Sequence, residues 1–272
     1  MNKRTSLSYW ISLGNLKDLK KSCNLALLPW EQRLMYIKEQ GFEGVAGIHE
    51  EIDTRLFETL GLQYASGVSF LHPAAGLDAL RKSVDLGVAS ISVHLGHGLE
   101  PENEIDRWIE MIYEFTELHH TAIYLETHRG TCTQDIRSCI ALAKRHPYIQ
   151  WTGDFSHWYN GLLLGQYFDQ KISYLSPIFK RTHMLHGRVA SDGCIQPPMN
   201  QISAQTWAHY QALWQETLTQ SEAPIIPIVI ELLSHKIGYD PGVWQAGSPI
   251  DDLADRWQDA LYLKQKLNHW FQ

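Results

Sequence analysis

The sequence TAIYLETH, residues 121–128, decides the fold, because an apolar run there ends in Glu126 and His128. Three later stretches have the same form, namely IQWTGDFSH (149–157), RTHMLHGRV (181–189) and IPIVIELL (226–233). Short apolar runs separated by segments of helical period are typical of buried parallel strands. The four stretches follow one another at about the spacing of βα units, so we predict four consecutive strands with helices between them.

The same alternation extends through the N-terminal half of the chain. Further strands are predicted at residues 6–12, 41–49, 62–70 and 89–96. Helices are predicted at residues 30–41, 74–87, around 105–115, and at 134–145, 203–219 and 252–270. The clearest helix has a core-facing stripe of apolar residues at the three-and-four spacing, formed by Ile105, Trp108, Ile109, Ile112 and Phe115.

Eight βα units are the number that closes a parallel barrel. No linker rich in Pro, Gly or Ser divides the sequence, so we predict an α/β fold, a single (β/α)8 TIM barrel, with residues 1–272 as one domain. A doubly wound sheet would place a G-x-G-x-x-G turn after the first strand, and SLGNLKDLKK (12–21) does not contain one.

The composition excludes several classes of protein. The chain has 272 residues, of which 44% are hydrophobic and 19% charged, an ordinary globular balance. Its formal net charge of −7 gives no field that would attract a phosphate backbone, so we expect no nucleic-acid partner. The 4 cysteines form no CxxC pair, which favours a reducing, cytoplasmic location. No apolar run approaches the ~18 residues of a membrane helix, so we expect no membrane partner.

Polar residues at the ends of the last four strands are the candidate site, because active sites of such barrels lie at the carboxyl ends of the strands. Glu126, Asp154, His186 and Glu231 are each about one βα unit apart and should converge. Carboxylates with one imidazole suit a catalytic divalent ion, and the absence of thiolates argues against structural zinc. We expect one ion, with Mn²⁺ or Zn²⁺ favoured and Mg²⁺ or Co²⁺ as alternatives.

Each candidate residue also has a purely structural interpretation. Asp154 fits the N-cap of a following helix as well as it fits a metal ligand. Glu126 and Glu231 could pair with Arg129 or Arg188, since a buried unpaired carboxylate is costly. His94, His97 and His128 could be neutral histidines that are hydrogen-bonded in the barrel mouth.

Two further features follow the late strands. Trp158 fits core packing, and its alternative role is to form the apolar wall beside a sugar ring. The stretch ASDGCIQPPMNQ, within residues 189–202, is too long for a simple βα connection and is expected to be a lid or an interface loop.

Five motifs together resemble the xylose isomerase-like barrel superfamily, which includes sugar phosphate isomerases and epimerases and also endonuclease IV. These motifs are VHLGHG (93–98), YLETHRGT (124–131), GDFSHW (153–158), HGR (186–188) and VIELL (229–233). The resemblance covers essentially the whole chain. It is specific for the superfamily and says little about the substrate.

The resemblance implies roles for individual residues. In ketose 3-epimerases of this superfamily a divalent metal is held by residues that match Glu126, Asp154, His186 and Glu231. By the same resemblance Glu126 and Glu231 are the acid/base pair, which moves a proton next to a carbonyl through a metal-stabilised enediolate. By the same resemblance His157 contacts the substrate oxygens, and Arg188, His94, His128 and Trp158 are the further candidate substrate-binding residues. Arg188 departs from the epimerase pattern, in which the arginine follows the strand-seven histidine by several residues rather than two.

The leading hypothesis is therefore a divalent-metal-dependent isomerase or epimerase of a small sugar, keto-sugar or polyol derivative. The alternatives are a carbon–oxygen lyase on a keto-sugar or keto-glycoside, an endonuclease IV-like phosphodiesterase, and a barrel that only binds metal or carbohydrate. The additional Asp-x-His metal pair of endonuclease IV has no counterpart in residues 189–202. A phosphorylated substrate would need a cluster of Arg, Lys or helix N-terminal glycine residues near the last two strands, and Lys236 alone does not make such a cluster. An unphosphorylated substrate is therefore favoured. A homodimer is the expected assembly if the barrels pair through their mouths.

Overall fold

Eight parallel strands form a closed barrel in sequence order, with β8 paired to β1. The computed structural model describes residues 5–20, 22–47, 52–239, 242–243, 251–252 and 254–271. The strands are β1 (Ser6–Ser12), β2 (Gly44–Ala46), β3 (Gln63–Phe70), β4 (Ser90–Leu95), β5 (Ala122–Glu126), β6 (Trp151–Gly153), β7 (Thr182–Gly187) and β8 (Ile225–Ile230). The predicted (β/α)8 barrel is confirmed. Residues 48 and 49, the end of the predicted second strand, lie outside the described residues.

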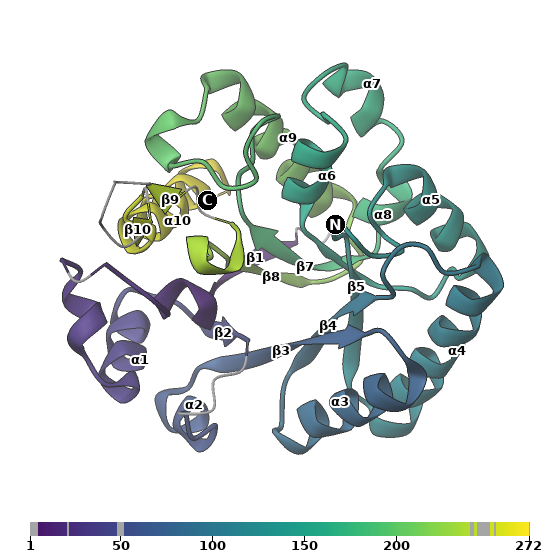
Figure 1. The fold of residues 1–272 in the computed structure, drawn as a ribbon, viewed down its shortest axis with the longest axis horizontal. Coiled ribbons are helices and arrows are strands. Elements are labelled where there is room, and N and C mark those ends of the chain that lie inside the picture. Colours follow the sequence, from purple (N-terminus) through teal and green to yellow (C-terminus); the bar gives the residue numbers. More distant parts are fainter. Residues whose placement is uncertain are drawn as a thin grey trace.

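Helices are arranged around the strands (Figure 1). The longer ones are α1 (Trp30–Glu39), α3 (Pro73–Asp85), α4 (Glu102–His119), α5 (Ile136–Arg145), α9 (Ala204–Gln220) and α10 (Arg256–Phe271), all of which were predicted. Four short helices were not, namely α2 (Arg55–Leu60), α6 (Phe155–Gly161), α7 (Phe168–Ile172) and α8 (Ser176–Phe179). They are too short to carry a recognisable helical stripe. The two-residue strands β9 (Gly242–Val243) and β10 (Asp251–Asp252) pair antiparallel to each other.

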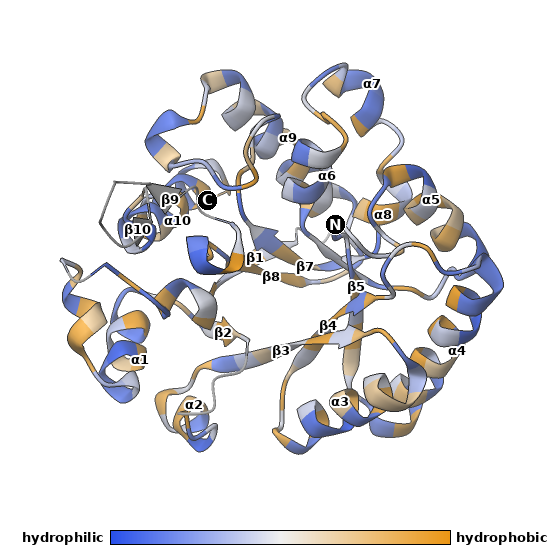
Figure 2. Ribbon diagram, in the orientation of Figure 1, coloured by the Kyte–Doolittle hydropathy of each residue, from blue (hydrophilic) through white to orange (hydrophobic). Residues whose placement is uncertain are grey.

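The main apolar core lies between the barrel and its surrounding helices. The predicted stripe of α4 is buried there, from Ile105 to Phe115. Figure 2 shows the corresponding alternation of hydrophilic and hydrophobic residues on α3 and α4. Among the described residues no helix is both long and apolar enough to cross a membrane.

A second cluster fills the inside of the barrel and consists of Trp10, Ala65, Met184 and Val229, with Ala46 and Tyr124 packed against it. Ser92 and Thr152 complete this floor with a hydrogen bond of 2.6 Å between their hydroxyls. Because side chains alternate along a strand, residues two positions after the floor residues also point inward, at the carboxyl ends of the strands. This next layer is the barrel mouth, which holds the candidate site.

Gly44 permits the close packing of the floor. A Cβ atom at this position would lie 2.4 Å from Cδ2 of the Trp10 indole, whereas a Cβ at Gly67 would meet nothing within 4 Å. We expect Gly44→Ala to lower the free energy of unfolding by about 1–3 kcal/mol through overpacking, as measured by urea denaturation. Gly67→Ala is the matched control and should leave it nearly unchanged. Equal stabilities for the two variants would contradict this packing account.

Candidate metal centre

Four side chains from successive strand ends meet around one imidazole nitrogen. The Nδ1 atom of His186 lies 3.4 Å from Glu126 Oε1 and 3.4 Å from Glu231 Oε2. Asp154 Oδ2 lies 3.6 Å from the same nitrogen. Glu126, Asp154 and His186 are all buried. The structure thus brings together the four residues that the sequence spacing selected.

Asp154 combines the two roles that the sequence left open. It is the N-cap of α6, where its Oδ1 accepts hydrogen bonds from the Ser156 backbone N–H at 3.0 Å and from the Ser156 hydroxyl at 2.5 Å. Its Oδ2 has no hydrogen-bond partner and faces His186 and His157. One oxygen therefore fixes the side chain, and the other remains available to a ligand.

The electrostatics of the cluster depend on positive charge. Burial alone would raise the pKa of Glu126, but His186 and His94 outweigh it and hold that pKa well below its usual range. Burial would likewise raise the pKa of Asp154, and the buried Arg188 guanidinium outweighs it, so this pKa is also lowered. Conversely, Glu126 and Glu231 overcome the effect of burial on His186 and raise the His186 pKa. The carboxylates stay ionised because cations surround them.

The donor set fits a divalent metal ion. Ligand atoms of Glu126, Asp154 and His186 all lie within 4.8 Å of one another. Asp154 Oδ2 and His186 Nδ1 are buried and make no hydrogen bond, which is costly unless another partner satisfies them. Carboxylate oxygens and an imidazole nitrogen are ligands for Mg²⁺, Mn²⁺ or Zn²⁺. A bound ion would replace the proton on His186 as the compensating charge.

Glu231, the fourth expected ligand, is held differently from the other three. Its Oε2 pairs with Nη2 of the buried Arg188, and its backbone oxygen accepts a hydrogen bond of 3.0 Å from Arg188 Nε. The guanidinium also lies 4.2 Å from the centre of the Tyr239 ring. Arg188 therefore positions Glu231 in this structure. It is one of the two arginines that the sequence analysis named as partners for the glutamates.

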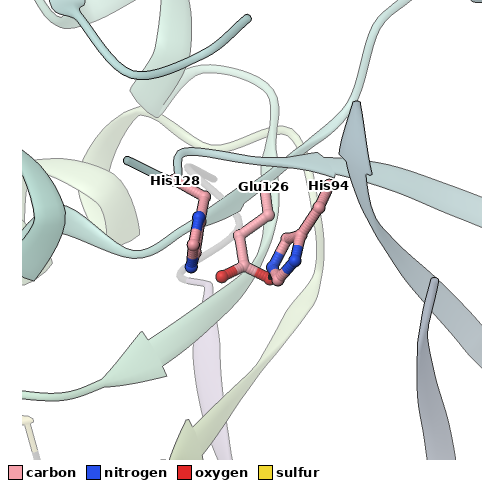
Figure 3. A group of neighbouring side chains, drawn as sticks. All are labelled: His94, Glu126 and His128. Atoms are coloured by element: carbon pink, nitrogen blue, oxygen red, sulfur yellow. Dashed lines mark ion pairs between the residues drawn. The ribbon is translucent and has the colours of Figure 1, made fainter. Parts of the chain in front are cut away.

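Three imidazoles form a row beside the cluster. His94 Nε2 lies 3.0 Å from Glu126 Oε2, and its ring stacks on His128 at 4.1 Å between centroids (Figure 3). The His128 ring lies 4.0 Å from that of His157. Burial lowers the pKa of His157 to about 3, so this residue is neutral at physiological pH. The row places three expected substrate-binding residues next to Glu126.

Tyr239 belongs to the site although the sequence analysis did not single it out. Its hydroxyl lies 3.1 Å from His128 Nε2, and its ring covers Arg188. The residue follows β8 in a loop, where no strand or helix period indicates which side chain turns toward the barrel. Only the tertiary structure identifies it.

Trp158 does not join the group. Its indole is fully buried, and Nε1 donates a hydrogen bond of 3.1 Å to the carbonyl oxygen of Thr133. This position corrects its expected role beside a sugar ring, because the ring packs in the core behind the site, as its structural interpretation anticipated.

The loop of residues 189–202 is tied to the barrel. The Gln196 side chain donates to the Leu233 carbonyl at 2.8 Å and accepts from the Leu233 backbone N–H at 2.7 Å. Several of its residues are buried, among them Val189, Ala190 and Ile195. In this structure the loop is therefore packed against the segment that follows β8, next to Glu231.

A cavity of about 130 Å³ opens next to Glu126, His186 and Glu231. Its opposite wall consists of small residues from the first three strands, Ser12, Ala46, Ala65 and Gly67. The cavity thus has charged residues on one side and small, uncharged residues on the other.

The neutral state of His157 gives stability a pH dependence. Between pH 3 and 6.5 the unfolded chain binds a proton on this histidine and the folded chain does not, so stability rises with pH across that window. In urea titrations with EDTA present, we expect His157→Gln to reduce the slope of unfolding free energy against pH by up to ~1.4 kcal/mol per pH unit. An unchanged slope would show that His157 is protonated in the folded protein.

No family model matches the sequence, and no curated protein matches it. Solved structures do. The "probable 3-DHS dehydratase AsbF involved in the petrobactin synthesis" of Bacillus anthracis has a TM-score of 0.63 at 14% identity, over 96% of this chain and 98% of that one. Endonuclease IV from Thermus thermophilus has a TM-score of 0.56 at 13% identity, over 97% of this chain and 98% of that one.

A xylose isomerase-like TIM barrel protein from Mycobacterium smegmatis, in complex with magnesium, has a TM-score of 0.55 at 13% identity, over 100% of this chain and 98% of that chain. At such identities the similarity is one of fold. The chain therefore has the fold of the xylose isomerase-like TIM barrels, as its strand-end motifs indicated.

Proposed function

We propose that this protein is a divalent-metal-dependent isomerase or epimerase that moves a proton next to the carbonyl of a small sugar, keto-sugar or polyol derivative. The observation that carries the proposal is the group around His186 Nδ1, where three carboxylates from β5, the end of β6 and the residue after β8 converge. Glu126, Asp154 and His186 would hold the ion, with Glu231 as the fourth ligand. A bound divalent ion would supply the positive charge that stabilises a substrate oxygen as it becomes negative.

Glu126 and Glu231 are the proposed acid/base pair. Both carboxylates line the cavity, and both approach the same nitrogen of His186. Burial would raise the pKa of Glu231, but His186 and Arg188 outweigh it and lower that pKa. An ionised carboxylate can accept a proton from a carbon next to a carbonyl and, once protonated, can return it to the substrate; return by the partner carboxylate requires that the partner first takes up a proton from solvent.

The neighbouring residues orient this pair. His94 contacts Glu126 through its second oxygen, Oε2, and Arg188 contacts Glu231 through both its side chain and its backbone. Fixed carboxylates lose little freedom when the substrate binds, which favours proton transfer. We assign His157, His94 and His128 to the substrate oxygens, because their row lies beside Glu126.

A carbon–oxygen lyase is the second candidate. The same proton abstraction would start it, and loss of a hydroxyl or alkoxyl group from the next carbon would complete it. The similar structure from Bacillus anthracis is that of a probable dehydratase. An unsaturated product would select the lyase over the isomerase.

Solvent exchange tests the proton transfer. In D₂O with added Mg²⁺ or Mn²⁺, we expect a ketose such as D-fructose or D-xylulose to gain deuterium next to its carbonyl, as followed by NMR. Glu126→Gln and Glu231→Gln should each slow exchange by about 10²-fold or more, since each removes a general acid/base.

Glu110→Gln, at an exposed position on α4, is the matched control and should exchange like the wild type. Exchange that is absent for every ketose, or equal in the Glu126 and control variants, would contradict the proposed function.

A further inference from the structure

The inward-facing layer at the barrel mouth is divided into two unlike halves. The last five strands contribute the ionisable residues His94, Glu126, Asp154, His186 and Glu231. On β1 and β3 the equivalent positions hold the small residues Ser12 and Gly67, and Ala46 and Ala65 of the floor layer below also line the cavity. A cavity of about 130 Å³ occupies the space that larger side chains would fill at these positions.

The β3 side of the mouth is open to solvent. Strand alternation directs Gly67 and Ser69 into the barrel, yet both are exposed, whereas Val68 and Phe70 on the helix-facing side are buried. A Cβ at Gly67 would meet no atom within 4 Å, and its φ does not lie in the left-handed region. Gly67 therefore faces empty space that a larger side chain could occupy without strain.

A second observation indicates that this space receives a ligand. His186 lines the cavity and is only 6% exposed, and its Nδ1 has no hydrogen-bond partner. Burial of an unsatisfied polar atom is costly. This nitrogen, which the metal ion would take up, borders the space that the small residues leave open, so a molecule in that space would lie next to the ion.

The charge of the lining restricts the ligand. Glu126 and Glu231 line the cavity, and no Lys or Arg is among the described residues that do so. Arg129 lies over the ring of Tyr239, 5.2 Å from its centre, and Lys236 pairs with Asp18. Within the described lining, a phosphate would therefore meet the carboxylates of Glu126 and Glu231 and no Lys or Arg side chain.

We infer that the small-residue wall formed by Ser12, Ala46, Ala65 and Gly67 binds a neutral, hydroxyl-bearing substrate, and that Gly67 limits the size of the substrate that can bind. This inference deepens the proposed function and rests on it for the class of substrate. Ser12 offers a hydroxyl to the ligand, while Ala46 and Gly67 leave room for its carbon chain. The charged half of the mouth then faces the reacting end of the same molecule.

Calorimetric titration with Mg²⁺ present tests the inference. The probes are D-xylulose and D-fructose, each compared with its phosphate ester. For the wild type we expect a neutral ketose to bind with a Kd at least tenfold lower than that of its phosphate. The valine side chain of Gly67→Val should occupy part of the binding cavity and raise the Kd of the neutral ketose at least tenfold.

Gly67→Ala should give a smaller loss and serves if the valine variant does not fold. Gly161→Val on α6 is the control, because a Cβ there also meets nothing within 4 Å, and it should bind like the wild type. Tighter binding of the phosphates, no binding of either neutral ketose, or unchanged binding in both Gly67 variants would overturn the inference. Binding of a neutral ketose without deuterium exchange would instead contradict only the proposed function and leave the inference about binding intact.

Discussion

The convergence of three carboxylates on His186 Nδ1 is the constraint on which the site depends. Carboxylates that are mostly buried so close together repel one another, and they remain ionised only because His186, His94 and Arg188 supply positive charge. Asp154 Oδ2 and His186 Nδ1 still have no hydrogen-bond partner. This combination of ionised, fixed and unsatisfied groups is what a divalent ion requires of its ligands.

The barrel explains why these groups can meet. Each comes from a different strand end, and closing the sheet places all the ends around one mouth. The floor of Trp10, Met184 and their neighbours supports the mouth from below. Among the described residues at the strand ends, the ionisable side chains come from the β4 to β8 side, and the small residues of β1 to β3 leave room for a small molecule beside the charged group.

The sequence predicted the parts of the structure that follow from strand and helix periods. The barrel and the positions of Glu126, Asp154, His186 and Glu231 depend only on where strands end, and the spacing fixes that. The place of Tyr239 depends on how a loop packs, which no period encodes. For Arg188 and Trp158 the sequence offered two interpretations each, and only the tertiary packing selects the pairing with Glu231 and the burial in the core. The role of Gly67 could not be predicted from the sequence either, because the empty space beside a glycine is evident only when the neighbouring residues have been placed.

Metal content, measured by mass spectrometry on protein purified without chelator or metal-affinity resin, tests the central claim most directly. Asp154→Asn is the informative variant, because asparagine can keep the N-cap of α6 while it removes the charge and one carboxylate oxygen. The account predicts about one divalent ion per wild-type chain and its loss in the variant. No bound ion in the wild type, even after metal is added back, would show that these carboxylates are structural and would contradict the account.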